Sequence, residues 1–219
     1  MELWLDTHAT STVQRAKDMG VLHGITTNPS IVASSGRPLR ALLDDFLSLQ
    51  AGPVAVQVVG TDAQEMLRQA KALWGYSQRL MIKVPVTEAG LICMYRLAQE
   101  GIPVLATALF EPQQALLACK AGASYLAPYV GRIRDQGVDP WAVLKQMVEI
   151  KRHYGFNCKI LGAGLRTKED FNSCASLGLC SVTIPEKIFN PLFQPSEGMA
   201  KALSDFTNDW QRAEPTHIF

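Results

Sequence analysis

The stretch LMIKVPVTEAGLICMYRLAQEGIPVLATAL, residues 80–109, holds two short apolar runs separated by a segment of helical periodicity. The runs 80–86 and 103–109 are rich in Val, Leu and Ile, which is typical of strands buried on both faces. The amphipathic segment 88–101 between them ends on Gly101, as helices often do. This strand–helix–strand order predicts a unit of parallel β-structure.

The same alternation extends along the whole chain. Further strands are predicted at 2–6, 23–27, 54–59, 124–130, 158–164 and 181–185, with amphipathic helices at 62–77, 111–122 and 139–155. Eight strands alternating with helices favour a closed (β/α)8 TIM barrel. An open doubly wound sheet is the alternative, but its first turn is normally glycine-rich, whereas the first turn here is DTHATS. We therefore predict a single (β/α)8 barrel over residues 1–219.

An extra helix is predicted at the C-terminal end, over residues 197–213. Its apolar face consists of Met199, Leu203, Phe206 and Trp210. This face is too large to remain in water, so we expect it to pack on its own barrel or on a neighbouring subunit.

Composition excludes several classes of protein. With 47% hydrophobic and 19% charged residues and a net charge of +1, the chain is neither disordered nor broadly basic, so no nucleic-acid partner is expected. The five cysteines form no CxxC pair, and the four histidines lack ligand spacing, so we expect reduced thiols and no metal site. No signal peptide and no apolar run of roughly 20 residues is present, which predicts a cytoplasmic protein without a membrane partner.

Lys83 is the unusual residue of the opening stretch, because it lies inside a run that is otherwise apolar. Burial of an unpaired ammonium costs several kcal/mol unless the group loses its proton. Either the amine extends from a strand end into water, or the protein needs a neutral amine at this position.

Polar residues follow or end most of the predicted strands, where TIM barrels place their active sites. Some have ordinary structural explanations, such as a helix cap for an aspartate or a packed ring for a tyrosine. Taken together, they predict a site at the barrel mouth. The set is Asp6, Thr26, Thr27, Asn28, Gln57, Lys83, Thr107, Tyr129, Arg132, Gly164 and Arg166.

This set favours Schiff-base carbonyl chemistry, in which a neutral lysine amine attacks a ketone. Burial and the nearby Arg132 are both expected to lower the pKa of Lys83. Tyr129 is then suited to proton transfer, alone or through a water held by Gln57 and Thr107. Asp6 and Asn28, with Thr26, are placed to orient the amine and the substrate. The Gly164 loop, with Arg132 or Arg166, suits a phosphate.

Several blocks of sequence resemble the small transaldolase family, most closely its fructose-6-phosphate aldolase branch. The blocks are LDT (5–7), GITTNPSI (24–31), KVPVTEAG (83–90), GIPVLATALF (101–110), APYVGRI (127–133) and FTNDWQ (206–211). The resemblance implies a (β/α)8 barrel, sugar or sugar-phosphate substrates, no metal or cofactor, and Lys83 as the Schiff-base lysine. It also implies a decamer of two pentameric rings, in which the terminal helix reaches a neighbour.

Two positions distinguish the branches of this family. The aldolases carry glutamine and tyrosine where transaldolases carry glutamate and phenylalanine, and this chain has Gln57 and Tyr129. Other positions depart from the family pattern: Gly164 stands where a serine is usual, Arg166 where a lysine is usual, and Phe110 where a tyrosine is common. These departures concern the choice of substrate.

Three functions are therefore open at this point. The first is a class I aldolase that joins dihydroxyacetone, or a similar hydroxyketone, to an aldehyde such as glyceraldehyde 3-phosphate. The second is a transaldolase, in which the same intermediate awaits a second sugar phosphate. The third is a non-catalytic barrel that binds sugar phosphates, for which the substitution at Gly164 is the only support.

Overall fold

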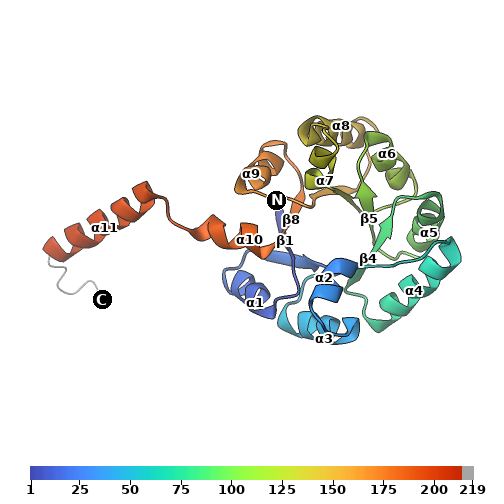
Figure 1. Cartoon of the computed structure of the whole chain (residues 1–219), viewed down its shortest axis with the longest axis horizontal. Helices are drawn as coiled ribbons and strands as arrows, with labels where there is room; N and C mark the ends of the chain where they lie inside the picture. The colour runs from blue at the N-terminus through green and yellow to red at the C-terminus, as the bar shows by residue number, and fades with distance from the viewer. Residues whose placement is uncertain (214–219) are drawn as a thin grey trace.

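Eight parallel strands pair in sequence order and close into a barrel, because β1 is paired with both β2 and β8 (Figure 1). The computed structural model describes residues 1–213. The strands are β1 (Glu2–Asp6), β2 (Leu22–Thr26), β3 (Val54–Gln57), β4 (Leu80–Pro85), β5 (Val104–Leu109), β6 (Tyr125–Pro128), β7 (Lys159–Gly162) and β8 (Ser181–Ile184). The predicted (β/α)8 TIM barrel is confirmed.

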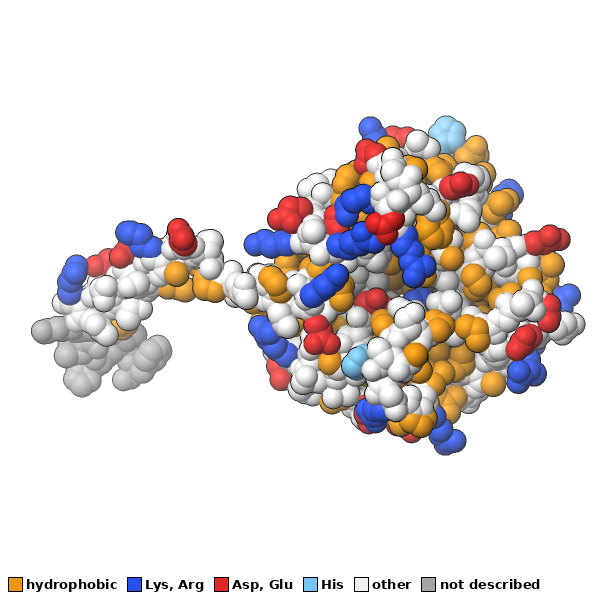
Figure 2. Space-filling model, viewed as in Figure 1, with side chains coloured by type: hydrophobic (Ala, Val, Ile, Leu, Met, Phe, Trp, Pro, Cys, Tyr) orange, Lys and Arg blue, Asp and Glu red, His pale blue; other side chains and the backbone are white. Residues whose placement is uncertain are grey.

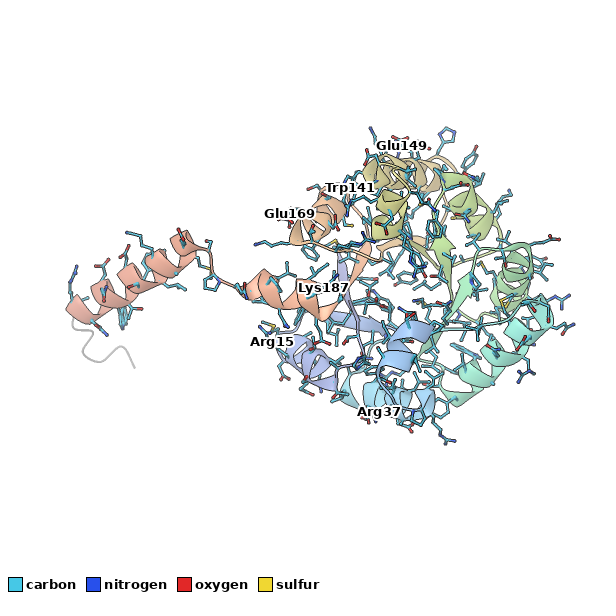
Figure 3. All side chains as sticks on the ribbon, viewed as in Figure 1. Arg15, Arg37, Trp141, Glu149, Glu169 and Lys187 are labelled. Atoms are coloured by element: carbon cyan, nitrogen blue, oxygen red, sulfur yellow. The ribbon has the colours of Figure 1, made fainter. Side chains whose placement is uncertain are left out.

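Helices surround the strands as an outer ring (Figure 1). The helices of the described chain are α1 (Thr10–Asp18), α2 (Pro29–Ser34), α3 (Leu39–Leu49), α4 (Ala63–Tyr76), α5 (Glu88–Gln99), α6 (Pro112–Lys120), α7 (Val130–Asp135), α8 (Pro140–His153), α9 (Lys168–Ser176), α10 (Glu186–Phe189) and α11 (Glu197–Arg212), with the 3₁₀ helix η1 (Asn190–Phe193). Of these, α11 lies outside the ring. Exposed charges such as Glu149 and Glu169, labelled in Figure 3, lie on the outer side of this ring. The ring therefore shields the strands from solvent on their outer face.

The hydrophobic core has two layers, because successive side chains of a strand point to opposite faces. The outer layer lies between the strands and the helices. The inner layer fills the barrel with Trp4, Ala55, Met81, Leu105, Tyr125, Ala127, Leu161 and Ala163. Lys83 is two residues beyond Met81, so it belongs to the inward-facing set at the end of β4.

Gly24 of β2 makes room for Trp4, which is fully buried inside the barrel. A Cβ atom at Gly24 would lie 2.7 Å from the Trp4 ring and 2.7 Å from the Pro53 carbonyl oxygen. Both distances are shorter than van der Waals contact, so no larger residue fits without displacing a neighbour. The indole thus packs at the level of the strand starts, beneath the residues of the mouth.

The C-terminal helix α11 projects away from the barrel (Figure 1). Its apolar residues Met199, Leu203, Phe206 and Trp210 are 52–68% exposed. The predicted helix at 197–213 is confirmed, but the expectation that this face could pack on its own barrel is wrong. The chain leaves the barrel after η1, which is tied to α1 because Arg15 (Figure 3) donates to Asn190 at 2.9 Å.

None of the helices within residues 1–213 is both long enough and apolar enough to cross a lipid bilayer.

Candidate active site

A cavity of about 350 Å³ opens at the carboxyl ends of the strands. Figure 2 shows the corresponding hollow at the centre of the barrel face, with Lys and Arg side chains gathered along one edge. Eight of the eleven predicted site residues line it: Asp6, Thr26, Asn28, Gln57, Lys83, Tyr129, Arg132 and Gly164. The structure therefore brings these eight residues together at the mouth of the barrel.

Lys83 lies at the base of this cavity and is only 5% exposed. Its Nζ atom donates a hydrogen bond to the main-chain oxygen of Thr27 at 2.7 Å. Burial lowers the pKa of the amine, because the charged form loses its hydration, and the negative charge of Asp6 opposes this shift in part. The expected contribution from Arg132 is not found, and its guanidinium instead lies over the Tyr129 ring, 5.0 Å from the centroid.

Asp6 faces the same cavity from the end of β1. The Thr26 hydroxyl donates to its Oδ1 atom at 2.6 Å, and the Thr183 hydroxyl lies 2.7 Å from that of Thr26. Burial raises the pKa of Asp6, whereas Lys83 and the hydrogen bond from Thr26 act in the opposite direction. Burial therefore pushes both Asp6 and Lys83 toward their uncharged forms.

Tyr129 presents its hydroxyl to the cavity from the residue after β6. This hydroxyl is 2.7 Å from that of Thr107, which is fully buried at the end of β5 and does not itself line the cavity. The Tyr129 ring also meets Phe110 edge to face, with centroids 5.8 Å apart. Thr107 and Phe110 thus fix the direction of the phenol.

The strand predicted at 124–130 is shorter in the structure. It ends at Pro128, because Tyr129 is already the N-cap residue of α7.

Gln57 is positioned by strand register. It is the Cα partner of Lys83 in the β3–β4 pairing, so both side chains stand on the inward face at the same level. The amide of Gln57 is therefore available to a substrate or a water beside the amine.

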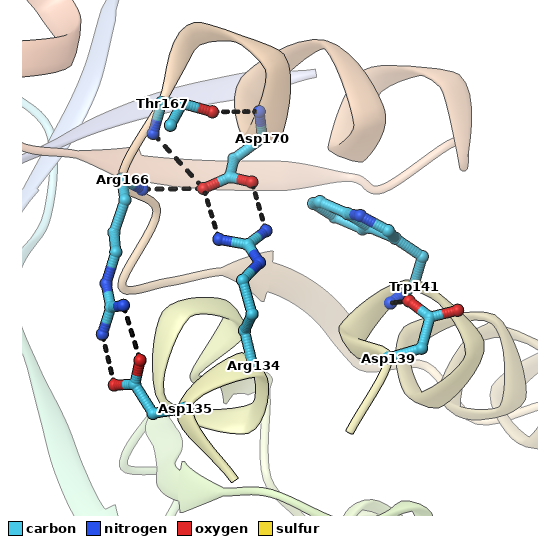
Figure 4. A network of polar contacts seen from close by, with 7 residues as sticks. All are labelled: Arg134, Asp135, Asp139, Trp141, Arg166, Thr167 and Asp170. Atoms are coloured by element: carbon cyan, nitrogen blue, oxygen red, sulfur yellow. Dashed lines mark hydrogen bonds and ion pairs between the residues drawn. The ribbon is translucent and has the colours of Figure 1, made fainter. Parts of the chain in front are cut away.

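Two arginine–aspartate pairs, drawn in Figure 4, join the segments that follow β6 and β7. Arg134 of α7 binds Asp170 of α9 with both nitrogens, the shorter contact being 2.6 Å. Asp170 also accepts from the main-chain nitrogen of Arg166 at 2.8 Å, and the Arg166 guanidinium pairs with Asp135. Arg166 does not line the cavity, so the expectation that it faces a phosphate there finds no support in the geometry.

The loop after β7 nevertheless reaches the cavity through Gly164. This residue has φ +65°, a left-handed conformation that favours glycine, and a Cβ atom there would meet nothing closer than 3.9 Å. The wall is therefore open at the position where the resemblance leads one to expect a serine.

Sequence reasoning missed Thr183 and Ser30, which also line the cavity. Thr183 occupies an inward position near the end of β8, the one strand from which no polar residue was collected. Since inward positions alternate along a strand, a count from the strand end could have found it. Ser30 lies in the first turn of α2 and within the block GITTNPSI, but it does not end a strand, so the search of strand ends passed over it.

Within residues 1–213, no three His, Cys, Asp or Glu side chains come together in a way that could hold a metal ion. The chemistry available at the mouth is that of one buried amine, a phenol, a buried carboxyl group and an amide. These groups can attack a carbonyl carbon and move protons beside it.

Comparison with known proteins defines the relationship. The family model described as Transaldolase/Fructose-6-phosphate aldolase matches residues 3–216. The chain belongs to this family. It is 37% identical over 212 residues to a "Probable transaldolase" of Coprothermobacter proteolyticus, a match that spans 97% of each chain.

Other members of the transaldolase/fructose-6-phosphate aldolase family are similarly close. A "Probable transaldolase 2" of Listeria monocytogenes is 34% identical over 212 residues, covering 96% of each chain. A "Probable transaldolase" of Phenylobacterium zucineum is 35% identical over 212 residues, covering 97% of each. The family resemblance stated from the sequence blocks is confirmed.

Proposed function

We propose that this protein is a class I aldolase that cleaves or forms fructose 6-phosphate, or a related product of a hydroxyketone and an aldehyde. The observation that carries the proposal is the buried amine of Lys83, with a lowered pKa, at the base of the mouth cavity. A neutral amine is the form that attacks a ketone.

The proposed reaction begins with attack of the Lys83 nitrogen on the substrate ketone carbon. The resulting carbinolamine loses water to give an iminium ion, which accepts the electrons of the adjacent carbon–carbon bond as that bond breaks. The hydroxyl proton beside the broken bond passes to Tyr129, directly or through water, and the aldehyde leaves. The remaining enamine takes up a proton, and hydrolysis then releases dihydroxyacetone and restores the amine. No metal or cofactor takes part in this proposal.

The surrounding residues have distinct proposed roles. The Thr107 contact, 2.7 Å from the phenol, keeps Tyr129 pointed into the cavity, and Gln57 holds water beside Lys83. Asp6 takes and returns protons during formation and loss of the carbinolamine, because burial already favours its protonated form. Thr26 orients Asp6, and Asn28 binds substrate hydroxyls.

We propose that a phosphate on the aldehyde end lies near Arg132 and the Gly164 loop. Arg132 lines the cavity, whereas Arg166 is paired with Asp135 outside it. A single guanidinium supplies a bidentate contact to phosphate oxygens. Both phosphorylated and unphosphorylated aldehydes are therefore proposed acceptors.

Transaldolase activity is the second candidate, and the names of the relatives favour it. Gln57 and Tyr129 favour the aldolase instead, because a phenol can perform the proton transfer that a glutamate and its water would otherwise perform. The two reactions share Lys83 and differ in whether dihydroxyacetone is released.

Incubation with fructose 6-phosphate alone distinguishes the candidates. The aldolase proposal predicts free dihydroxyacetone without any acceptor, no product from Lys83→Met, and about 10²-fold slower release from Tyr129→Phe. Dihydroxyacetone transfer that occurs only when an aldose phosphate is added would favour the transaldolase.

We further propose a cytoplasmic homo-oligomer in which α11 packs on a neighbouring subunit. The exposed apolar face of α11 supports the intersubunit contact, since such a face is costly in water. A decamer of two pentamers is the arrangement that the resemblance implies.

A further inference from the structure

Two thiols far from the mouth lie in contact: the Sγ atoms of Cys119 and Cys158 are 3.1 Å apart. Cys119 is the next-to-last residue of α6, and Cys158 immediately precedes β7. Helices of the barrel run back toward the strand starts, and α6 and α8 are neighbours in Figure 1. The pair therefore lies at the end of the barrel opposite to Lys83.

The surroundings of this pair favour a thiolate. The hydrogen bond from Cys119 lowers the pKa of the Cys158 thiol, and the positive charge of Lys151, in the last turn of α8, acts in the same direction against the effect of burial. Cys158 is 3% exposed, whereas Cys119 is half-buried. One sulfur is thus within reach of a small reagent and the other is packed behind it.

The remaining cysteines provide a contrast. Burial raises the pKa of Cys93 to about 11 and that of Cys174 to about 12, which leaves both as unreactive thiols. Cys180 is half-buried, like Cys119. Among the five cysteines, all within residues 1–213, only Cys119 and Cys158 have sulfur atoms in contact.

We propose that Cys119 and Cys158 form a reversible intrachain disulfide when the protein meets a hydroperoxide. The contact with Cys158 and burial raise the pKa of the Cys119 thiol, so the charge lies first on Cys158. Cys119 becomes the nucleophilic thiolate when its proton passes to Cys158 across the 3.1 Å contact. This thiolate attacks a peroxide oxygen, becomes a sulfenic acid and expels hydroxide, or an alkoxide from an organic peroxide. Cys158 then attacks the sulfenic sulfur and expels the oxygen as water. Overall, two thiols lose two protons and two electrons, and the hydroperoxide is reduced to water and an alcohol or to two waters.

The bond would join segments that are 39 residues apart in sequence. Closure requires the sulfurs to approach by about 1 Å, since a disulfide is about 2.05 Å long. A cross-link at this separation restricts the unfolded chain and should raise the thermal stability of the barrel. Because the pair lies at the far end of the strands, the mouth cavity should remain open.

Treatment of the purified full-length protein with hydrogen peroxide tests the proposal, with dithiothreitol as the reversing agent. The expected result is an intact mass lower by two hydrogen atoms and a single cross-linked peptide joining residues 119 and 158. The oxidised protein should also unfold at a temperature several degrees higher. Cys119→Ala should lose all three effects, and the matched control Cys180→Ala should keep them.

Other results would overturn the inference. These are a mass gain from added oxygen without loss of two hydrogens, a cross-link to another cysteine or to a second chain, or identical behaviour of the parent and Cys119→Ala. Should Cys119→Ala fail to fold, Cys158→Ser provides the same comparison. All of these readouts are independent of aldolase activity, so the inference can fail without affecting the proposed reaction.

Discussion

At the scale of single residues, Lys83 and Asp6 have opposite charges yet share one buried cavity. Burial lowers the pKa of the amine and raises that of the carboxyl group, while their mutual attraction acts against both shifts. A neutral amine is therefore accessible at a pH below the usual pKa of a lysine, about 10.4. In the proposed reaction, the balance between these two residues sets the pH at which the Lys83 amine becomes nucleophilic.

Asp6→Asn tests this balance. Removal of the carboxylate removes the charge that raises the pKa of Lys83, so the pKa of the amine should fall further. The neutral amine should then predominate at lower pH. We expect the rising limb of the pH profile for Schiff-base formation to move to more acidic pH, even though turnover is slower.

The control for this experiment is Asp135→Asn. Asp135 pairs with Arg166 outside the cavity, so its loss should leave the rising limb unchanged. If the rising limb of the pH profile does not move in Asp6→Asn, or moves to more alkaline pH, Asp6 does not raise the pKa of Lys83 as stated here.

Gly164→Ser should alter the choice of substrate. A Cβ atom there meets nothing closer than 3.9 Å, so the position has room to carry a side chain at the cavity wall. Since φ is +65°, the change should destabilise the fold by about 1 kcal/mol. One added hydrogen bond should lower KM for a phosphorylated aldehyde about fivefold, with little change for the unphosphorylated one. Equal changes for both aldehydes in steady-state assays would refute a phosphate contact at this wall.

Residue types at strand ends could be predicted from sequence, but their partners could not. Lys83, Gln57 and Tyr129 were found because each is polar within or beside an apolar run. Arg166 is held outside the cavity by Asp135, which is 31 residues away in sequence on α7. The hydrogen bond from Lys83 to the main-chain oxygen of Thr27 leaves no trace in residue types.

At the scale of elements, β5 contains a local irregularity that serves the site. Its pairing with β6 shifts register between Ala106 and Leu109, and Ala108 has φ +58°, which is unusual for a residue with a side chain. Leu105 packs inside the barrel, whereas Leu109 packs against the outer layer. The bulge thus ends the inward-facing series at Thr107, the residue that holds Tyr129.

Ala108→Gly tests whether this conformation is strained. Glycine relieves about 1 kcal/mol of strain from the left-handed conformation. It also increases the conformational entropy of the unfolded chain, which costs a similar free energy. The free energy of unfolding should therefore stay within about 0.5 kcal/mol of the parent value. Ala106→Gly, two residues earlier at a regular buried position, should cost more than about 1 kcal/mol. Urea unfolding of both variants measures the difference, and equal losses would show that the bulge is not strained.

Strand and helix positions were predictable because both periodicities are pronounced. The predicted helices 62–77, 88–101, 111–122 and 139–155 correspond to α4, α5, α6 and α8. Gly101, which was expected to end a helix, has positive φ, as do the glycines that follow α6, α8 and α9, which are Gly122, Gly155 and Gly178. Strand ends were less accurate, because the chain turns toward the mouth while its residues are still apolar, as at Val58 and Val130.

At the scale of the whole molecule, the exposed apolar face of α11 has no packing partner within the part of the chain that the structure describes. Its amphipathic sequence predicts a buried face, but the helix stands away from the barrel with that face exposed (Figure 1). The sequence pattern shows that the face needs a partner and does not say which surface covers it. A second copy of the chain is the partner proposed above.

Replacement of Phe206 and Trp210 by serine should therefore reduce the oligomeric state. The barrel core does not include either residue, so its secondary structure and unfolding should be preserved. Light scattering after size-exclusion chromatography measures the assembly, and circular dichroism monitors the fold. Asn208→Ser, on the opposite side of the helix, is the matched control. An unchanged assembly in the double variant would contradict the intersubunit contact.

The central claim is that Lys83 carries the reaction as a neutral amine that bonds covalently to a hydroxyketone. Borohydride reduction in the presence of dihydroxyacetone, followed by peptide mass mapping, tests it most directly. We expect a stable dihydroxyacetone adduct on the peptide that contains Lys83, and none on the same peptide of Lys83→Met. No adduct on the parent protein, or an adduct on a different lysine such as Lys71 or Lys145, would contradict it.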